Sequence, residues 1–248
     1  MSNINVLKRD GTQEQLNLEK VHKMVEFACE GLAGVSESQV EIQSQLQFCD
    51  GIKSSDIQEI LIRSASDLIS EEHPNYQYVA ARLLLFGLRK AVHGHPEILP
   101  PLLEHVKGCI DKGVYDGTIV NRYSEEEWDR INSFVEHERD YLFTYAGLRQ
   151  VVDKYLVQDR STGQHYESPQ QMYIMIAATL FANYPTETRL DYVRRYYNAI
   201  STHKINIPTP IMGGVRTPIR QFASCVLVDI DDTLDSIFSS DMAIGKYV

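Results

Sequence analysis

One thiol near the C-terminus stands out as a residue that could do redox chemistry. Cys225 lies within residues 222–230, a run of apolar and β-prone residues typical of a strand buried on both faces. On these residues alone, a cysteine in such a strand is usually a small core residue, and burial would keep its pKa at or above the value of about 8.5 of a free thiol. A dithiol reaction requires a second cysteine with its Cα atom roughly 4.4–6.8 Å away. The other three, Cys29, Cys49 and Cys109, are predicted on helices of other regions.

A group of cations in the first 90 residues could bind a polyphosphate. Lys8 and Arg9 precede a tight turn, Lys20 lies on the helix that follows, and Arg89 and Lys90 lie near the end of a later helix. Ammonium and guanidinium groups that converge on one point bind phosphate oxygens through charge-assisted hydrogen bonds. The alternative is a solvated hairpin edge and ordinary helix-end cations, which the helix dipole favours.

The elements that must position these cations form a predicted α+β unit over residues 1–92. Residues 3–17 are predicted to be a β-hairpin with a two-residue turn at Asp10-Gly11. Four helices should follow. Their start signals are Asn17 as the N-cap of a helix to about Glu30, capping boxes at Ser36 with Gln39 and at Ser55 with Gln58, and Pro74 in the first turn of the fourth.

A second, helical region is predicted over residues 93–204, after a boundary marked by Gly and Pro near residue 93. Its signals are a capping box at Ser124 with Glu127, an amphipathic run at 138–156, a small hairpin at 156–166, a buried helix capped by Ser168 with Gln171, and a helix from about 187 to 202. Trp128, Tyr141 and Tyr145 are predicted to belong to the core.

Residues 205–248 predict the start of an α/β core. Residues 205–215 are predicted to be an extended, proline-punctuated loop, 222–230 a strand, and the residues after Asp232 a helix with Asp232 as its N-cap. One strand and one helix cannot close a sheet or barrel, so further chain is needed to complete this core. The overall fold class is therefore α+β and mainly α-helical.

The composition excludes several classes of protein. With 43% hydrophobic residues and a net charge of −10, the chain is typical of a globular protein whose surface repels nucleic acid and anionic lipid. The longest apolar stretch, residues 172–184, is too short to span a bilayer, and the N-terminus has no targeting segment, so a cytoplasmic location is expected. No Cys-x-x-Cys pair occurs, and His93 and His95 have no third ligand nearby, so we expect no metal in this chain.

Several ordered motifs resemble the large (alpha) subunits of class I ribonucleotide reductases, of the class Ia type. The motifs similar to the ATP-cone domain of that family are residues 6–11, 15–20, 50–56 and 76–83. Those similar to its helical domain and first barrel strand are residues 137–146, 154–160, 166–169, 208–212 and 224–226. The resemblance implies an ATP-cone, a helical domain, and the first strand and helix of an incomplete ten-stranded α/β barrel.

The resemblance also implies functional residues. An activity site for ATP or dATP, with Mg²⁺, is implied at Lys8, Arg9, Glu14, Gln15, Leu16, Asn17, Leu18, Glu19, Lys20, Ser54 and Lys90. Substrate contacts are implied at Thr209, Ser224 and Cys225, with Cys225 as one of two catalytic thiols that end as a disulfide. A specificity site for a dNTP effector is implied at Asp232, Thr233 and Leu234, at the start of a dimer-forming helix. As a departure, Gln58 and Gly87 stand where bacterial members carry histidine.

By the same resemblance, the chain acts in the reduction of ribonucleoside diphosphates by thiyl-radical chemistry. The implied partners are a second large subunit, a separate small subunit with a di-iron site and tyrosyl radical, and a thioredoxin- or glutaredoxin-type reductant. The radical-bearing and second reducing cysteines are expected on a second polypeptide that completes a split large subunit, so this chain alone is expected to be inactive. The alternatives are a non-catalytic, nucleotide-sensing regulatory protein and an inert truncated product.

Overall fold

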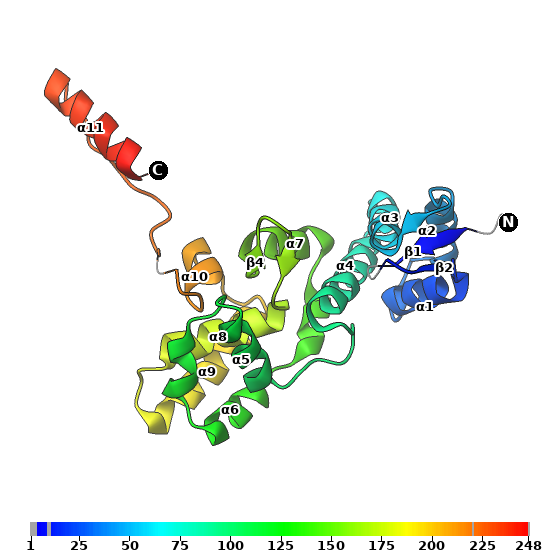
Figure 1. Cartoon of the computed structure of the whole chain (residues 1–248), viewed down its shortest axis with the longest axis horizontal. Helices are drawn as coiled ribbons and strands as arrows, with labels where there is room; N and C mark the ends of the chain where they lie inside the picture. The colour runs from blue at the N-terminus through cyan, green and yellow to red at the C-terminus, as the bar shows by residue number, and fades with distance from the viewer. Residues whose placement is uncertain (1–3, 9–10, 220, 248) are drawn as a thin grey trace.

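Two helical units and a projecting C-terminal helix follow one another along the chain (Figure 1). The structure is a computed structural model and describes residues 4–8, 11–219 and 221–247. The mainly helical α+β class predicted from the sequence is confirmed. Of the described residues, 4–93 form what we call the N-terminal unit, 102–214 the central unit and 221–247 the C-terminal segment.

A small sheet and four helices make up the N-terminal unit. Its elements are β1 (Asn5–Leu7), β2 (Gln13–Gln15), α1 (Leu18–Cys29), α2 (Glu37–Gln45), β3 (Ile52–Lys53), α3 (Ser54–Asp67) and α4 (Tyr76–His93). The strand order is β2-β1-β3: β1 pairs antiparallel with β2, with Val6 opposite Glu14, and parallel with β3, with Val6 opposite Ile52. The predicted hairpin and four helices are confirmed, whereas β3 is too short for a periodic signal and was not predicted.

The structure confirms only some of the start signals predicted for these helices. Asn17 caps α1 as predicted, since its side-chain oxygen accepts a hydrogen bond from the Lys20 N–H at 3.2 Å. The capping box at Ser55 is wrong, because α3 begins at Ser54 and Gln58 donates instead to the Leu83 carbonyl at 2.7 Å.

The other two signals are also partly wrong. Ser36 occupies the N-cap of α2 without a side-chain cap, and its predicted partner Gln39 accepts a hydrogen bond from the Tyr76 hydroxyl at 2.7 Å. Pro74 lies before α4, whose N-cap is Asn75. Two of the predicted turn residues, Arg9 and Asp10, lie outside the described residues; Gly11 beside them has φ +84°, a backbone conformation that favours glycine.

Short helices and one small hairpin form the central unit. Its elements are α5 (Leu102–Asp111), η1 (Gly117–Arg122), α6 (Glu125–Asn132), η2 (His137–Leu142), α7 (Tyr145–Gln150), η3 (Val151–Tyr155), β4 (Gln158–Asp159), β5 (Gln164–His165), α8 (Pro169–Phe181), α9 (Thr186–Ser201) and α10 (Thr209–Gly214). Both predicted capping boxes, at Ser124 and Ser168, are confirmed. The amphipathic run 138–156 is divided into a 3₁₀, an α and a π turn rather than one helix. Most of α8 is buried, as predicted.

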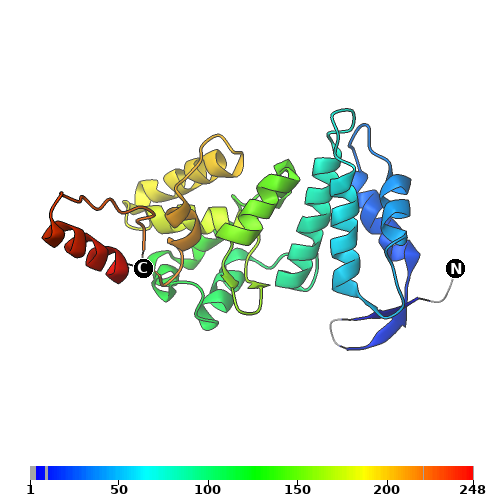
Figure 2. The same cartoon turned by 90° about the horizontal axis from the view of Figure 1, so that it is seen from above.

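Helix α4 belongs to both units. It packs against α1 and α3 on one side and against η2, α7 and β5 on the other, so it lies between the two units (Figure 2). Arg89 on α4 forms a buried ion pair with Asp140 of η2, with Nη2 and Oδ2 2.8 Å apart. The N-terminal unit is therefore joined to the central unit through specific buried contacts as well as by the chain.

The C-terminal segment departs most from the sequence prediction. The strand predicted at 222–230 is absent; these described residues have no regular structure, and Leu227 is 99% exposed. A strand needs a neighbour to satisfy its backbone N–H and C=O groups, and no described segment of the chain pairs with this one. The extended loop predicted at 205–215 contains instead the short helix α10.

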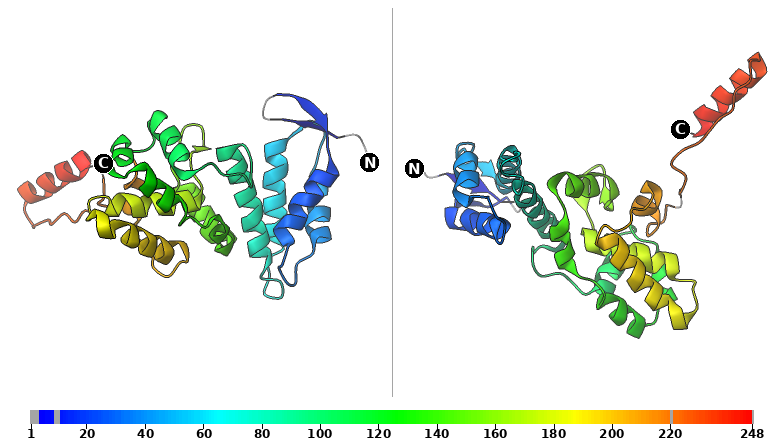
Figure 3. Two further views of the ribbon diagram at one scale, coloured as in Figure 1. Left: turned by 90° about the horizontal axis from the view of Figure 1, so that it is seen from below. Right: turned by 180° about the vertical axis from the view of Figure 1, so that it is seen from behind.

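The last predicted helix is present as α11 (Leu234–Tyr247), which projects away from the rest of the chain (Figure 3). Its start was predicted one residue too early. Thr233, not Asp232, caps it: the Thr233 Oγ1 atom accepts a hydrogen bond from the Ser236 N–H at 3.2 Å. Several apolar side chains of α11 are exposed, namely Leu234, Ile237, Phe238, Met242, Ile244 and Tyr247.

Candidate functional site

A cavity of about 390 Å³ opens in the N-terminal unit between the hairpin, α1, α3 and α4. It brings together seven residues that the sequence analysis selected: Lys8, Glu14, Leu16, Asn17, Lys20, Ser54 and Lys90. Except for Glu97, which follows α4 in the chain, every described residue that lines the cavity belongs to the N-terminal unit.

Some selected residues lie elsewhere. Gln15, Leu18 and Glu19 do not line the cavity. Glu19 pairs with Lys23 across one helical turn, at 3.1 Å. Arg9 lies outside the described residues. Arg89, considered with Lys90 as a phosphate ligand, turns away from the cavity into its buried pair with Asp140.

Lysines outnumber carboxylates among the residues that line this cavity. The Glu14 carboxylate lies between two ammonium groups, 2.6 Å from Lys8 Nζ and 3.5 Å from Lys20 Nζ. The hydrogen bond from Lys8 lowers the pKa of Glu14. Lys23 and Lys90 add two more cationic side chains to the lining. Four lysines against two glutamates, Glu14 and Glu97, leave the lining cationic although the whole chain carries a net charge of −10.

Part of the cavity lining is apolar. Met24 and Phe27 on α1, Ile57 on α3 and Phe86 on α4 form this part. These residues were not selected from the sequence. Their spacing could have revealed two of them, because Met24 and Phe27 follow Lys20 at intervals that place all three on one face of a helix. Lysines and apolar side chains in one cavity suit a ligand that carries both phosphates and a flat ring.

Gln58 and Gly87 lie together beside the cavity. A Cβ atom added to Gly87 would be 3.1 Å from Cγ of Gln58, tighter than an ordinary contact. The missing side chain thus lets Gln58 lie against α4, where its amide donates to the Leu83 carbonyl. The pair that departs from the bacterial pattern is one packed unit.

A second cavity, of about 620 Å³, lies beside α10. Thr209 lines it from the first turn of α10, with Lys154 and Arg160 among the other lining residues. Ser224 and Cys225 are not among them. The predicted substrate residues are therefore not brought into one cavity within the described chain.

A buried ion pair anchors α10. Arg216 and Glu167 are both fully buried; Arg216 donates from Nε to Glu167 at 2.8 Å, and from Nη1 to the Met212 carbonyl of α10 at 2.5 Å. Tyr115 also donates a hydrogen bond to Glu167. Burial is the main cause that raises the pKa of Tyr115, and the negative charge of Glu167 adds to it. No local pattern in the sequence points to this cluster, since its members lie far apart along the chain.

Two of the four cysteines are buried and two are exposed. Cys29 and Cys109 are buried, and burial raises their pKa values to about 11 and about 12. Cys49 and Cys225 are exposed. Cys225, predicted in a buried strand, lies instead in the irregular C-terminal segment, with its Sγ 3.8 Å from Ser224 Oγ. The Cys225 thiol is therefore exposed in this structure, and the prediction that it is a buried core residue is wrong.

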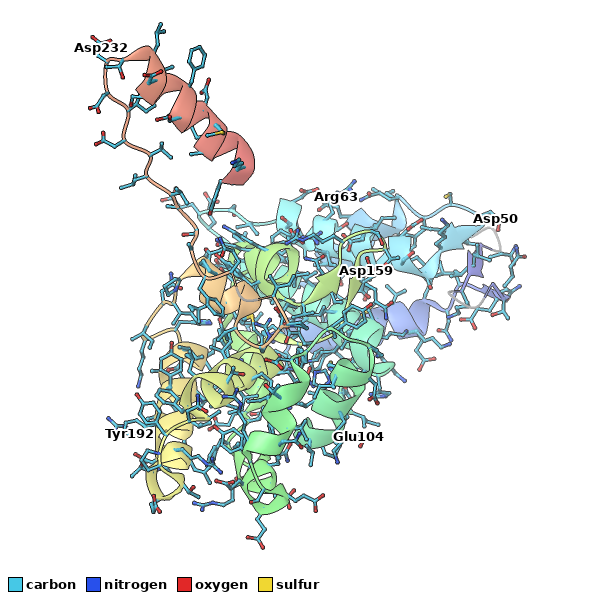
Figure 4. All side chains as sticks on the ribbon, turned by 60° about the vertical axis from the view of Figure 1, so that its left-hand side comes forward. Asp50, Arg63, Glu104, Asp159, Tyr192 and Asp232 are labelled. Atoms are coloured by element: carbon cyan, nitrogen blue, oxygen red, sulfur yellow. The ribbon has the colours of Figure 1, made fainter. Side chains whose placement is uncertain are left out.

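The predicted specificity residues lie at the start of α11. Asp232, Thr233 and Leu234 are all exposed, and Figure 4 shows Asp232 at the tip of the projecting helix, far from Asp50 of the N-terminal unit. Among the described residues, no group of three or more His, Cys, Asp or Glu side chains could hold a metal ion. Within the same residues, no helix is both long and apolar enough to cross a membrane.

Comparison with known proteins gives two family matches. Residues 4–91 match the ATP cone domain, and residues 141–220 match the ribonucleotide reductase all-alpha domain. The chain is 54% identical over 243 residues to a Haemophilus influenzae protein named ribonucleoside-diphosphate reductase subunit alpha, covering 98% of this chain and 32% of that protein.

Two further relatives agree. Subunit alpha of ribonucleoside-diphosphate reductase 1 of Escherichia coli is 54% identical over 246 residues, or 99% of this chain and 32% of the relative. The Enterobacteria phage T4 subunit alpha is 43% identical over 249 residues, or 100% of this chain and 32% of the relative. The chain spans about a third of the length of these relatives. It belongs to the ribonucleotide reductase large-subunit family and corresponds to the N-terminal portion of those subunits, an ATP-cone followed by the all-alpha domain.

Proposed function

We propose that this chain is the nucleotide-regulated N-terminal part of a ribonucleoside-diphosphate reductase alpha subunit, and that the cavity of the N-terminal unit binds ATP or dATP. The observation that carries this proposal is that one cavity of about 390 Å³ is lined both by four lysines and by apolar side chains of α1, α3 and α4. A nucleoside triphosphate has the matching distribution of charge and apolar surface.

The lysines that line the cavity receive the phosphates. Lys8 and Lys20 donate to the phosphate oxygens, with Ser54 and Lys90 on the neighbouring helices. Glu14 holds the two ammonium groups on one side of the cavity through its ion pairs. The base lies against the apolar part of the lining, near Phe27, where ring contacts add to the burial of apolar area. Gln15, Leu18 and Glu19 are neighbours in sequence of lining residues, and Mg²⁺ accompanies the phosphates.

Calorimetric titration of the chain with ATP and dATP tests the site. Lys20→Met should weaken binding by about 10- to 100-fold, since a charge-assisted hydrogen bond contributes about 1.5–3 kcal/mol. Lys107→Met is the matched control, because Lys107 is an exposed lysine of α5 outside the cavity. Equal affinities for both variants and the wild type, or no binding at all, would contradict the proposal.

We further propose that the C-terminal segment works in ribonucleotide reduction once the rest of the large subunit is supplied. Cys225 is one of two thiols that become a disulfide, and the two electrons and two protons they release replace the ribose 2′-OH by hydrogen, with water as the other product. Thr209 and Ser224 hold the substrate, and Asp232, Thr233 and Leu234 hold the effector dNTP.

The partners of this function follow from the same segment. The exposed apolar residues of α11, Phe238 and Met242 among them, support contact with the remaining barrel and with a second large subunit. The radical would come from a small subunit with a di-iron site and tyrosyl radical, and the disulfide would be reduced again by a thioredoxin- or glutaredoxin-type protein.

A turnover assay of the completed large subunit with its small subunit tests the thiol. Cys225→Ser should abolish reduction of a ribonucleoside diphosphate that depends on an external dithiol. Cys49→Ser is the matched control, since Cys49 is the other exposed thiol, and it should retain turnover. Full turnover of the Cys225→Ser enzyme would rule out the redox role.

A further inference from the structure

The short helix η2 touches the wall of the nucleotide cavity directly. Tyr141 of η2 packs edge-on against Phe27, with ring centroids 6.0 Å apart and an interplanar angle of 69°. Phe27 lines the cavity. The Tyr141 ring also lies 5.6 Å from the guanidinium carbon of Arg82 and 5.6 Å from that of Arg89, both on α4. A residue of the central unit is thus held by three residues of the N-terminal unit, one of them a cavity wall.

Asp140, the neighbour of Tyr141 in η2, extends these contacts further into the central unit. Arg89 Nη2 donates to Asp140 at 2.8 Å and to the His137 carbonyl at 2.6 Å. The second oxygen of Asp140 accepts from Gln170 of α8 at 2.9 Å, and Gln170 in turn accepts from the Tyr197 hydroxyl of α9 at 2.7 Å. One buried hydrogen-bonded chain therefore joins α4, η2, α8 and α9.

The nucleotide cavity reaches the start of this chain. On α4, Phe86 and Lys90 line the cavity, and Arg89 lies between them in sequence on another face of the helix. At the far end, α8 packs against α10, which begins at Thr209. The elements that hold the proposed nucleotide and the proposed substrate contact are thus connected through packed elements, with η2 in the middle.

A contribution to stability alone poorly explains this chain of buried hydrogen bonds. Asp140 is fully buried and burial raises its pKa, against the opposing effect of Arg89. Arg89 Nε has no hydrogen-bond partner among the described residues. A buried ion pair with an unsatisfied donor contributes little net stability, because desolvation offsets the attraction of the two charges. Such a pair can change its arrangement at low cost when a neighbour moves.

We propose that η2 senses occupancy of the nucleotide cavity and passes it to α8 through Tyr141 and Asp140. The inference rests on the proposed nucleotide site and adds the regulation of that site. A nucleotide seated against Phe27, Phe86 and Lys90 restrains α1 and α4; the Phe27–Tyr141 contact and the Arg89–Asp140 pair then restrain η2, and Gln170 restrains the first turns of α8.

Amide hydrogen exchange of the whole chain, with and without saturating ATP, tests this regulation. In the wild type, ATP should slow exchange in the N-terminal unit and also, by about threefold or more, in residues 137–142 and the first turns of α8. Tyr141→Leu should keep the slowing in the N-terminal unit and lose it in η2 and α8. Tyr192→Leu is the matched control, a partly exposed tyrosine of α9 on the opposite side of the molecule from Asp50 (Figure 4), and should behave as the wild type.

A second variant guards against a packing defect at Tyr141. Phe27→Leu alters the same contact from the N-terminal unit and should also remove the ATP-dependent slowing in η2 at saturating ATP. The proposal is overturned if slowing in the wild type stops at His93, or if both variants retain it in η2 and α8. Absence of ATP binding in calorimetry would overturn the nucleotide site itself, and the regulation with it, whereas binding with no slowing beyond His93 overturns the regulation alone.

Discussion

The N-terminal unit and the C-terminal segment carry functional residues under opposite conditions. In the first, the strands are paired, Val25 and Leu61 are fully buried, and seven of the selected site residues meet in one cavity. In the second, the backbone of residues 222–230 is unpaired, and Cys225 and Asp232 are exposed and lie apart from Thr209. A site built from neighbouring elements therefore forms within this chain, whereas a site that depends on a barrel needs strands from elsewhere.

The central unit lies between these extremes. Its Glu167 forms a fully buried ion pair with Arg216, which lies just beyond the end of the unit and before the irregular residues 222–230. Arg216→Met should destabilise the central unit. Removing one partner of a buried pair leaves an uncompensated charge, so we expect the free energy of unfolding to fall by about 3–5 kcal/mol. Urea unfolding followed by circular dichroism measures this loss. Arg63→Met, at an exposed arginine of α3 (Figure 4), is the control and should cost little; an Arg216→Met loss no larger than the control's would contradict this reading.

One buried and two half-buried histidines should make the two helical units sensitive to acid. Burial lowers the pKa values of His93, His105 and His137 to about 4. Because the unfolded chain binds these protons near pH 6.5 and the folded chain only near pH 4, the stability they contribute is present above about pH 6.5 and is lost as the pH falls toward 4.

The free energy of unfolding measured at pH 7, 6 and 5 should therefore decrease, by at most about 1.4 kcal/mol per pH unit for each histidine. His105→Gln should make the decrease shallower. Stability that stays level from pH 7 to pH 5 would show that these side chains do not remain neutral in the folded state.

The smallest effect is expected from removing the C-terminal segment. Deleting residues 221–248 takes away apolar side chains that are largely exposed in the described part of the segment, so the free energy of unfolding should change by less than about 0.5 kcal/mol. Urea unfolding of the shortened chain beside the full chain checks this. A loss of several kcal/mol would mean that the segment packs on the ordered units, and the contrast between the two regions would fail.

Local signals in the sequence predicted local structure well. Asn17, Ser124 and Ser168 cap helices as expected, because a cap needs only residues within one turn. The box at Ser55 failed because Gln58 found a partner on α4, which no local pattern reveals. The strand at 222–230 failed for a related reason, since its apolar residues describe a strand only where neighbours exist to pair with it.

The candidate site was predictable in part for the same reason. The cations around Glu14 were found through their motif, whereas Phe86 was missed because its role depends on how α4 meets α1. The Arg216–Glu167 pair was not predictable at all, since an arginine and a glutamate 49 residues apart give no sign in the sequence that they will meet.

A crystal structure of the chain with bound ATP would locate the nucleotide. We expect phosphate oxygens within hydrogen-bonding distance of Lys8 Nζ and Lys20 Nζ, and the base in contact with Phe27 in the cavity of the N-terminal unit. ATP bound instead beside Thr209 or at the start of α11, with the N-terminal cavity empty at saturating nucleotide, would contradict it.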